Sequence, residues 1–292
     1  MSEHYELQIS GATLPVAWEQ AMRRLWEERT NPYFRRPTEY DKLGDPLAIS
    51  GPMKIVVTEP TEEPRIHRAM PCGIADLEVY RMEVVDGIHD LWQDNGDPQK
   101  WQYTYSNRMR HYGRKVYDGM HEDYRLNPVS LQVEKTTVDQ VQYVIDTLAA
   151  CWYSRRAQIV IWNPHTDTIY PECPCLQRAW FTLIQLDENE YELECHVYMR
   201  SNDIFKACAM NMYAFTSLQA EIAYELEEEM SCRVRVGMYT HTVDDMHIYG
   251  SYFDEVEAFI AGLHKRTFEE RTYRTEDVQD IIKEAQDKHY AK

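Results

Sequence analysis

The sequence has little positive charge. Its 292 residues include 31 Lys and Arg against 49 Asp and Glu, which gives a formal net charge of −18. Non-specific binding of nucleic acid depends on many basic side chains that neutralise phosphates, so the composition argues against a nucleic-acid-binding protein. A few arginines gathered around one small phosphate are still compatible with this charge.

Long apolar runs are also absent, and cysteines are few. No run approaches the roughly 18 residues that a membrane-spanning helix needs, and the first residues are polar and acidic, so we expect neither a membrane association nor a signal peptide. The seven cysteines are odd in number and scattered, which does not suit a disulfide framework. We therefore expect a cytoplasmic protein with reduced thiols.

The sequence does contain clear helical and strand patterns. Apolar residues at helical spacing predict helices over 14–29, 74–92, 137–152, 204–230, 252–264 and 275–289. Thr136 or Thr137 is expected to cap the third of these. Apolar or alternating runs predict strands over 53–58, 157–162, 178–186, 191–199, 232–242 and 245–249. Residues 30–50 are expected to be irregular.

Nothing in the sequence marks a domain boundary. It has no repeat, no low-complexity block and no change in composition that would indicate a linker. Runs of helices and strands in this order are typical of the α+β class. We therefore expect a single α+β domain over 1–292, with helices packed on a mixed β-sheet.

Two cysteines lie close together in Cys173-Pro174-Cys175 and could be metal ligands. Structural zinc sites usually have about two to four residues between paired cysteines and need a second ligand pair. His165 lies upstream, but no second pair has the right spacing, and the zinc-deaminase pattern is missing. We expect no metal. The alternatives are a buried hydrophobic thiol or a reactive one, which a nearby cation would hold as thiolate.

Three further clusters could bind an anion or a polar ligand. Residues 155–156 (Arg-Arg) precede a predicted strand, and residues 200–203 (Arg-Ser-Asn-Asp) begin the long helix, where free N–H groups would suit a phosphate. The polar residues of 245–249 (Asp-Met-His-Ile-Tyr) share one face of a predicted strand. A solvated strand end, a helix cap and a polar outer face would explain them equally well.

Taken in order, these clusters resemble the thymidylate synthase family, which includes the pyrimidine nucleotide hydroxymethylases. The resemblance covers about residues 75–260 and implies the fold of that family. The motifs that carry it, in the family's order, are Tyr105–Arg110, Tyr153–Arg156, Ile161–Pro164, Pro174-Cys175, Arg200–Asp203, Asn211 and Asp245–Tyr249.

The resemblance implies covalent chemistry at Cys175. Its thiolate, which the nearby arginines would favour, is expected to add to C6 of a pyrimidine ring, so that C5 attacks the methylene group of 5,10-methylenetetrahydrofolate. Tyr105 matches the tyrosine that assists proton removal at C5. The catalytic glutamate is Glu78 or Glu83. They lie on one helix about 140° apart, so only one can face the cleft, and we favour Glu83.

The resemblance also implies a phosphate site shared between two subunits. Arg200 and Ser201 match phosphate ligands, and Arg155 and Arg156 match the pair that reaches into the neighbouring subunit's site. The enzyme is therefore expected to be a homodimer with shared active sites. Another family arginine lies in an N-terminal Arg-Thr-Gly-Thr loop that is missing here, and residues 35–36 (Arg-Arg) could replace it.

The remaining matches concern the folate, the sugar and the base. Asp203 matches the carboxylate that binds the pterin ring, and His247 and Tyr249 match the pair that holds the sugar 3′-hydroxyl. Asn211, eleven residues after Arg200, matches the residue that selects the base. An amide can donate to O4 and accept from N3–H of uracil, whereas cytosine-specific relatives carry Asp there. We therefore expect dUMP rather than dCMP as substrate.

Some departures indicate a divergent branch, closer to archaeal or phage members. The family's Pro-Cys-His is Pro174-Cys175-Leu176, the start of the long helix lacks Leu-Gly-x-Pro-Phe, and residues 287–292 lack the apolar tail that closes over folate. A looser lid could admit water and give 5-hydroxymethyl-dUMP instead of dTMP. We favour methylation. The other alternative, an inactive homologue that binds nucleotide or RNA, does not explain why so many site residues are retained.

Overall fold

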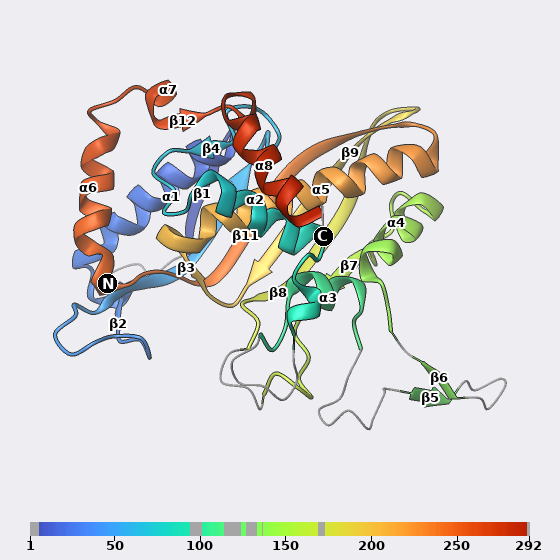
Figure 1. Ribbon diagram of the computed structural model, residues 1–292, viewed down its shortest axis with the longest axis horizontal. Coiled ribbons are helices and arrows are strands. Elements are labelled where there is room, and N and C mark those ends of the chain that lie inside the picture. Colours follow the sequence, from blue (N-terminus) through green and yellow to red (C-terminus); the bar gives the residue numbers. More distant parts are fainter. Residues whose placement is uncertain are drawn as a thin grey trace.

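A mixed eight-stranded sheet organises the chain (Figure 1). This computed structural model describes residues 6–93, 101–113, 124–126, 133–135, 137–168 and 173–290. The strand order is β1-β3-β11-β9-β8-β7, with β2 beside β3 and β10 beside β11. The strands are β1 Leu7–Gly11, β2 Arg35–Arg36, β3 Ala48–Val57, β7 Gln158–Val160, β8 Leu176–Asp187, β9 Glu190–Met199, β10 Asn202–Asp203 and β11 Arg233–Ile248.

The sheet mixes both kinds of pairing. β1 is parallel to β3, and β9 and β10 are parallel to β11, whereas the other pairs are antiparallel. Two small antiparallel pairs lie outside it: β4 Ile66–His67 with β12 Thr272–Tyr273, and β5 Tyr124–Leu126 with β6 Val133–Lys135. The mixed sheet confirms the predicted α+β class.

The helices form a layer on this sheet. They are α1 Leu14–Glu27, α2 Ile74–Val85, α3 Tyr105–Arg110, α4 Gln140–Ala150, α5 Ala209–Met230, α6 Phe253–Leu263, α7 Phe268–Arg271 and α8 Gln279–Tyr290. α1, α4 and α5 contact the strands, α2 packs on α5, and α8 packs on α2 (Figure 1). None of the helices in the described ranges is long and apolar enough to cross a bilayer.

The alternation along β9 explains why the core lies on one side of the sheet. Tyr191, Leu193 and Cys195 point to the helices and are buried, as predicted, whereas the intervening residues are only partly buried. Burial of this apolar face stabilises the fold by roughly 25 cal/mol per Å² of apolar surface. On the opposite face, side chains such as Trp180 and Tyr198 stay partly exposed.

One strand was predicted as two. The sequence favoured strands over 232–242 and 245–249, but β11 runs continuously from Arg233 to Ile248. Its register against β9 shifts between Val236 and Tyr239, and its register against β3 shifts between Val243 and Met246. A bulge adds an unpaired residue and breaks the alternation of period two, so the strand resembles two shorter ones in the sequence.

Other differences concern the ends of elements. The cap of α4 is neither Thr136, which lies outside the described residues, nor Thr137, but Asp139, whose Oδ1 accepts the N–H groups of Val141 and Gln142 at 3.0 Å. β3 begins at Ala48, inside the segment expected to be irregular. The N-cap is the residue just before the helical dihedral angles begin. Several neighbouring Thr or Asp side chains could serve there, so the sequence alone did not select Asp139.

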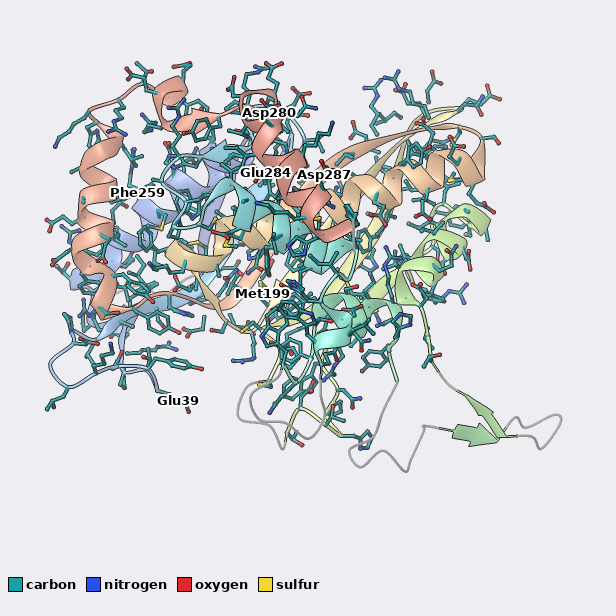
Figure 2. All side chains as sticks on the ribbon, in the orientation of Figure 1. Glu39, Met199, Phe259, Asp280, Glu284 and Asp287 are labelled. Atoms are coloured by element: carbon teal, nitrogen blue, oxygen red, sulfur yellow. The ribbon has the colours of Figure 1, made fainter. Side chains whose placement is uncertain are left out.

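The excess of acidic side chains lies partly on α8. Asp280, Glu284 and Asp287 recur at helical spacing, are exposed, and follow one side of this helix in Figure 2. Carboxylates on a solvated helix face cost little because water solvates them. Because these carboxylates are solvated at the surface of α8, the net negative charge of the protein is compatible with a group of arginines elsewhere in the molecule.

Candidate active site

Cys175 lies immediately before β8, where the chain enters the sheet. Its carbonyl accepts the N–H of Arg200 at 2.9 Å. The guanidinium of Arg200 donates to the carbonyl of Pro174 through Nε at 3.1 Å and to that of Cys173 through Nη2 at 2.8 Å. A guanidinium carries five N–H donors, so this one can shape the cysteine loop and still bind an anion.

Burial controls the protonation of this thiol. Desolvation raises the pKa of Cys175, the charge of Arg200 lowers it by less, and Cys173 raises it further. The sequence suggested that nearby arginines would favour the thiolate. Arg200 does act in that direction, but burial outweighs it because a thiolate is poorly solvated in a partly apolar site. The unliganded site therefore holds a neutral thiol near pH 7.

Three tyrosines surround the thiol. Burial raises the pKa of Tyr80 on α2, of Tyr103 just before α3 and of Tyr105 at the start of α3, and negative charge on Cys175 raises each further. The Tyr105 hydroxyl accepts the N–H of Leu176 at 3.3 Å, so its own proton stays available to donate. All three phenols are neutral hydrogen-bond donors over the working pH range.

An ion pair fixes α3 and hence the Tyr105 side chain. Arg108 binds the buried carboxylate of Asp167 through two nitrogens, at 2.6 and 3.2 Å, and also donates to the carbonyl of Ile161 at 3.2 Å. The same carboxylate accepts the N–H of Asn163 at 2.7 Å. Residues 161–164, which matched a family motif, thus act as the support of α3.

The two candidate glutamates lie in different surroundings. Glu78 is buried and accepts one hydrogen bond from Arg81 and one from Gln286 of α8, both at 2.8 Å. Glu83 lies 3.3 Å from Nδ1 of His89, and burial raises its pKa although the histidine opposes the shift. The charge of Glu83 also raises the pKa of Tyr80, whereas neither glutamate is among the groups that shift the pKa of Cys175.

A second group gathers where β10 and β11 end. Asp203 pairs with His247 across these strands, and Ser201 Oγ lies 3.5 Å from His247 Nδ1. The ring of Tyr249 packs against that of His247 with 4.7 Å between centroids. Burial and the charge of Asp203 raise the pKa of Tyr249 to about 12, with a smaller effect from Cys175. This group therefore adjoins the thiol.

Asp203 and His247 each keep a polar atom for a ligand. Asp203 Oδ1 accepts the N–H groups of Phe205 and Lys206 at 2.9 Å, whereas Oδ2 accepts none of the hydrogen bonds found among the described residues. His247 Nδ1 lies 3.0 Å from the carbonyl of Asp245, and its buried Nε2 has no partner in the described part of the chain. Buried polar atoms are rarely left unpaired in proteins, so His247 Nε2 fits a polar ligand, and the partly exposed Asp203 Oδ2 can accept from one.

Asn211 lies inside α5, buried next to these groups. Its Oδ1 accepts the hydroxyl proton of Tyr80 at 2.5 Å, and its Nδ2 donates to Asn202 Oδ1 at 3.3 Å. The sequence did not single out Tyr80, Tyr103 or Asn202. The one local signal was the placement of Tyr80 and Glu83 one turn apart on the same helix, which puts them on one face.

Arg155 and Arg156 are not brought to Cys175. Both are exposed, and neither guanidinium makes a hydrogen bond or ion pair with the residues that the structure describes. The Arg155 carbonyl accepts the indole N–H of Trp180 at 3.0 Å. Trp180 lies on the sheet face opposite the helices, so this arginine pair is located beside that face.

The two N-terminal arginines point in different directions. Arg35 donates to the carbonyl of Arg29 at 2.9 Å and lies over the ring of Phe253. Arg36 Nη1 lies 4.0 Å from Asp245 Oδ1, near the end of β11. Of the two, Arg36 is the one close to the group at the ends of β10 and β11.

The donor atoms of the site suit an organic anion. All seven cysteines are free thiols. Within the ranges that the structure describes, no three His, Cys, Asp or Glu side chains are grouped so that they could hold a metal ion. Around Cys175 lie phenols, a guanidinium and an amide, which recognise phosphate, carbonyl and ring N–H groups.

The pH dependence of alkylation should reveal the raised pKa of the Cys175 thiol. Because the thiolate is the nucleophile, the rate of alkylation by iodoacetamide should rise about tenfold per pH unit and continue to rise above pH 9. Peptide mapping in a Cys173→Ser background would follow this one thiol. A plateau below pH 8 would mean that the charge of Arg200 outweighs burial.

A comparison with protein families agrees with this geometry. The family model described as thymidylate synthase matches residues 75–285. The match covers more than half of the chain and extends further toward the C-terminus than the motifs did. It includes every residue of the two groups around Cys175 and His247.

Proposed function

This chain belongs to the thymidylate synthase family, and we propose that it transfers a one-carbon unit from 5,10-methylenetetrahydrofolate to C5 of dUMP, forming dTMP. The observation that carries this proposal is the position of Cys175 between Arg200 and three phenol donors, with Asn211 one hydrogen bond away from that cluster. Members of the family act at C5 of a pyrimidine nucleotide; the base, the product and the residue roles are our proposal.

The chemistry follows from the neutral thiol. Cys175 loses its proton to water as the nucleotide binds, and its sulfur forms a bond to C6, so that negative charge develops on C5 and O4 of the ring. Tyr105 is a neutral donor that stabilises this charge, and Tyr80 acts through the proton that it donates to Asn211. The folate supplies the methylene carbon. Once C5 has bonded to that carbon, Tyr105 assists transfer of the C5 proton to water, and the bond between the carbon and the folate nitrogen breaks. A hydride from the folate then reduces the exocyclic methylene to a methyl group as the Cys175 sulfur leaves C6, which gives dTMP and dihydrofolate; water returns a proton to the sulfur.

The polar atoms left unpaired serve as ligands. Asp203 Oδ2 accepts from the pterin ring, and His247 Nε2 and the Tyr249 hydroxyl hold the sugar 3′-hydroxyl. Arg200 and Ser201 bind the phosphate of the nucleotide. This assignment is supported by the free hydrogen-bonding capacity of Asp203 and His247 described above.

Glu83 serves as the proton-handling carboxylate, and replacing it tests this role. Glu83→Gln should lower kcat for tritium release from C5-labelled dUMP by about 100-fold, because an amide cannot carry the proton. The matched control is Glu78→Gln, which removes a carboxylate from the same helix. It should lower the thermal stability that Arg81 and Gln286 provide while keeping kcat within a few fold. A large loss of kcat in Glu78→Gln, with kcat nearly unchanged in Glu83→Gln, would assign the role to Glu78.

The sites are shared between two copies of the chain. The sheet face opposite the helices carries partly exposed apolar side chains, including Trp180 and Ile184, next to the exposed arginine pair at 155–156. A second copy packed on this face would bury these side chains and bring Arg155 and Arg156 toward its own phosphate site. Isologous contacts of this kind are the commonest in homodimers.

Mixing two inactive variants tests for shared sites. Cys175→Ala lacks the nucleophile, and the double variant Arg155→Ala/Arg156→Ala lacks the arginines donated to the neighbour. After exchange of subunits, half of the dimers are mixed and hold one intact site, so about a quarter of the wild-type activity should return. Each variant alone should stay inactive. Mixtures that remain as inactive as their components would show that each site belongs to one chain.

The product distinguishes two outcomes of the same mechanism. Methylation consumes a hydride from the folate and releases dihydrofolate, whereas attack by water on the exocyclic methylene gives 5-hydroxymethyl-dUMP and tetrahydrofolate. We expect dTMP and dihydrofolate in equal amounts when the protein is incubated with dUMP and 5,10-methylenetetrahydrofolate. A hydroxymethyl product without dihydrofolate, identified by mass, would make the protein a hydroxymethylase.

A further inference from the structure

A chain of buried hydrogen bonds connects Asn211 with the interior of the sheet. Tyr80 donates to Asn211 Oδ1 at 2.5 Å, and Asn211 Nδ2 donates to Asn202 Oδ1 at 3.3 Å. Asn202 Nδ2 lies 2.8 Å from His241 Nε2, and His241 Nδ1 lies 2.8 Å from the Tyr239 hydroxyl. We call these five residues the Asn211 relay. It starts beside Cys175 and ends in β11, and the sulfur of Met199, a residue labelled in Figure 2, lies against Asn202 and Asn211 in its middle.

The direction of the hydrogen bonds in the relay is set by the sulfur of Met199, which can only accept and lies 3.3 Å from Asn202 Nδ2 and 3.9 Å from Asn211 Nδ2. The His241 ring takes the tautomer that matches this direction. This ring is fully buried, and desolvation lowers its pKa to about 3, so it is neutral. A neutral imidazole has one donor nitrogen and one acceptor nitrogen. Since Asn202 presents its Nδ2 to Nε2, the proton lies on Nδ1 and is donated to Tyr239. Asn202 Oδ1 is consequently turned toward Asn211.

This direction prevents the Asn211 amide from turning over. A reversed amide would set its Oδ1 against Asn202 Oδ1, and two buried acceptors facing each other lose a hydrogen bond and repel. Tyr80 would not prevent the reversal, because a hydroxyl can donate or accept. Asn202 does not reverse in response, because its Oδ1 would then face Met199 Sδ, which has no hydrogen to donate, and His241 would have to move its proton to Nε2. The orientation of Asn211 therefore depends on residues that are remote from the nucleotide.

We propose that Asn202 and His241 are positioning residues that make Asn211 specific for uracil. The proposal rests on the function proposed above. An amide alone is ambiguous, because a reversed Asn offers oxygen to the amino group and N–H to N3 of cytosine. Held by the relay, Asn211 can donate to O4 the Nδ2 hydrogen that otherwise makes only a long 3.9 Å contact with Met199 Sδ, and it keeps one Oδ1 lone pair for N3–H, which is the uracil pattern. The relay thus gives Asn211 a preference for uracil over cytosine that an amide side chain alone does not have.

Two substitutions at one position test the proposal. Asn202→Leu keeps approximate size and removes the side-chain hydrogen bonds to Asn211, His241 and Met199, so the preference for dUMP over dCMP should fall by about tenfold or more. Asn202→Asp offers only acceptor oxygens to Asn211, and His241 can donate to it from Nε2, so this variant should retain the wild-type preference. Dissociation constants for both nucleotides, measured by calorimetry on variants with unchanged circular dichroism, give the preference without requiring turnover.

The tautomer of His241 provides an independent measurement. ¹⁵N NMR of the wild-type protein should find the proton on Nδ1; a proton on Nε2, or an unchanged preference in Asn202→Leu, would overturn the proposal. If the wild type binds dUMP over dCMP as expected but does not release C5 tritium, the proposed reaction fails and the relay stands. Equal dissociation constants for dUMP and dCMP in the wild type would overturn both the proposed substrate and the proposed role of the relay.

Discussion

Replacing Cys175 with alanine should abolish tritium release from C5-labelled dUMP and leave nucleotide binding nearly intact. In the proposed mechanism the sulfur is the atom that bonds to C6, and without that bond C5 does not become nucleophilic. Loss of a covalent nucleophile lowers rates by roughly 10⁴-fold or more. The phosphate, sugar and base ligands lie on Arg200, His247 and Asn211, none of which is held by the Cys175 side chain.

The neighbouring cysteine gives a matched control for this experiment. Arg200 binds the carbonyl of Cys173, not its thiol, so Cys173→Ala keeps the loop that presents Cys175. This variant should keep most of the tritium release, and its dissociation constant for dUMP should match that of Cys175→Ala. Normal tritium release by Cys175→Ala would contradict the proposed mechanism outright.

The second large effect concerns the base. Asn211→Asp should lower kcat/KM for dUMP by roughly 10²- to 10⁴-fold and raise it for dCMP, which reverses the preference. A carboxylate has no donor for O4 of uracil, whereas its oxygens can accept from the cytosine amino group. Parallel assays with both nucleotides measure the ratio directly. A variant that still prefers dUMP would mean that Asn211 does not read the base.

Much of the fold was readable from local patterns. The alternation in β9 identified the buried face, and the helical spacing in α1 and α5 located those helices to within a few residues. Patterns of this kind reflect burial on one side of an element, which the sequence records residue by residue. The bulges of β11 were missed because they interrupt the pattern without ending the strand.

The family motifs predicted the composition of the site but not its connections. Tyr80 and Asn211 are separated by 131 positions in the sequence, and Tyr105 and Leu176 by 71. Contacts across such separations depend on how α2 and α3 pack against α5 and β8, which no local pattern encodes. The motifs also gave Arg200 a role in phosphate binding alone, whereas it also holds the carbonyls of the cysteine loop.

The protonation of Cys175 is another property that depends on packing. A sequence shows which cations are near the thiol in the chain, but desolvation depends on side chains contributed by several elements. The raised pKa means that the thiolate is scarce in the free protein near pH 7. The single-domain organisation, the dimer and the identity of the catalytic glutamate remain predictions that the experiments above address.

The central claim is that the Cys175 sulfur bonds to C6 of a uracil nucleotide, and trapping that bond is its most direct test. With 5-fluoro-dUMP and 5,10-methylenetetrahydrofolate, the sequence of steps should stop before elimination, because fluorine cannot leave C5 as the proton does. Mass spectrometry of the intact protein should find one nucleotide and one folate added, and peptide mapping should place them on Cys175. An unmodified protein, or an adduct on Cys173, would contradict the claim.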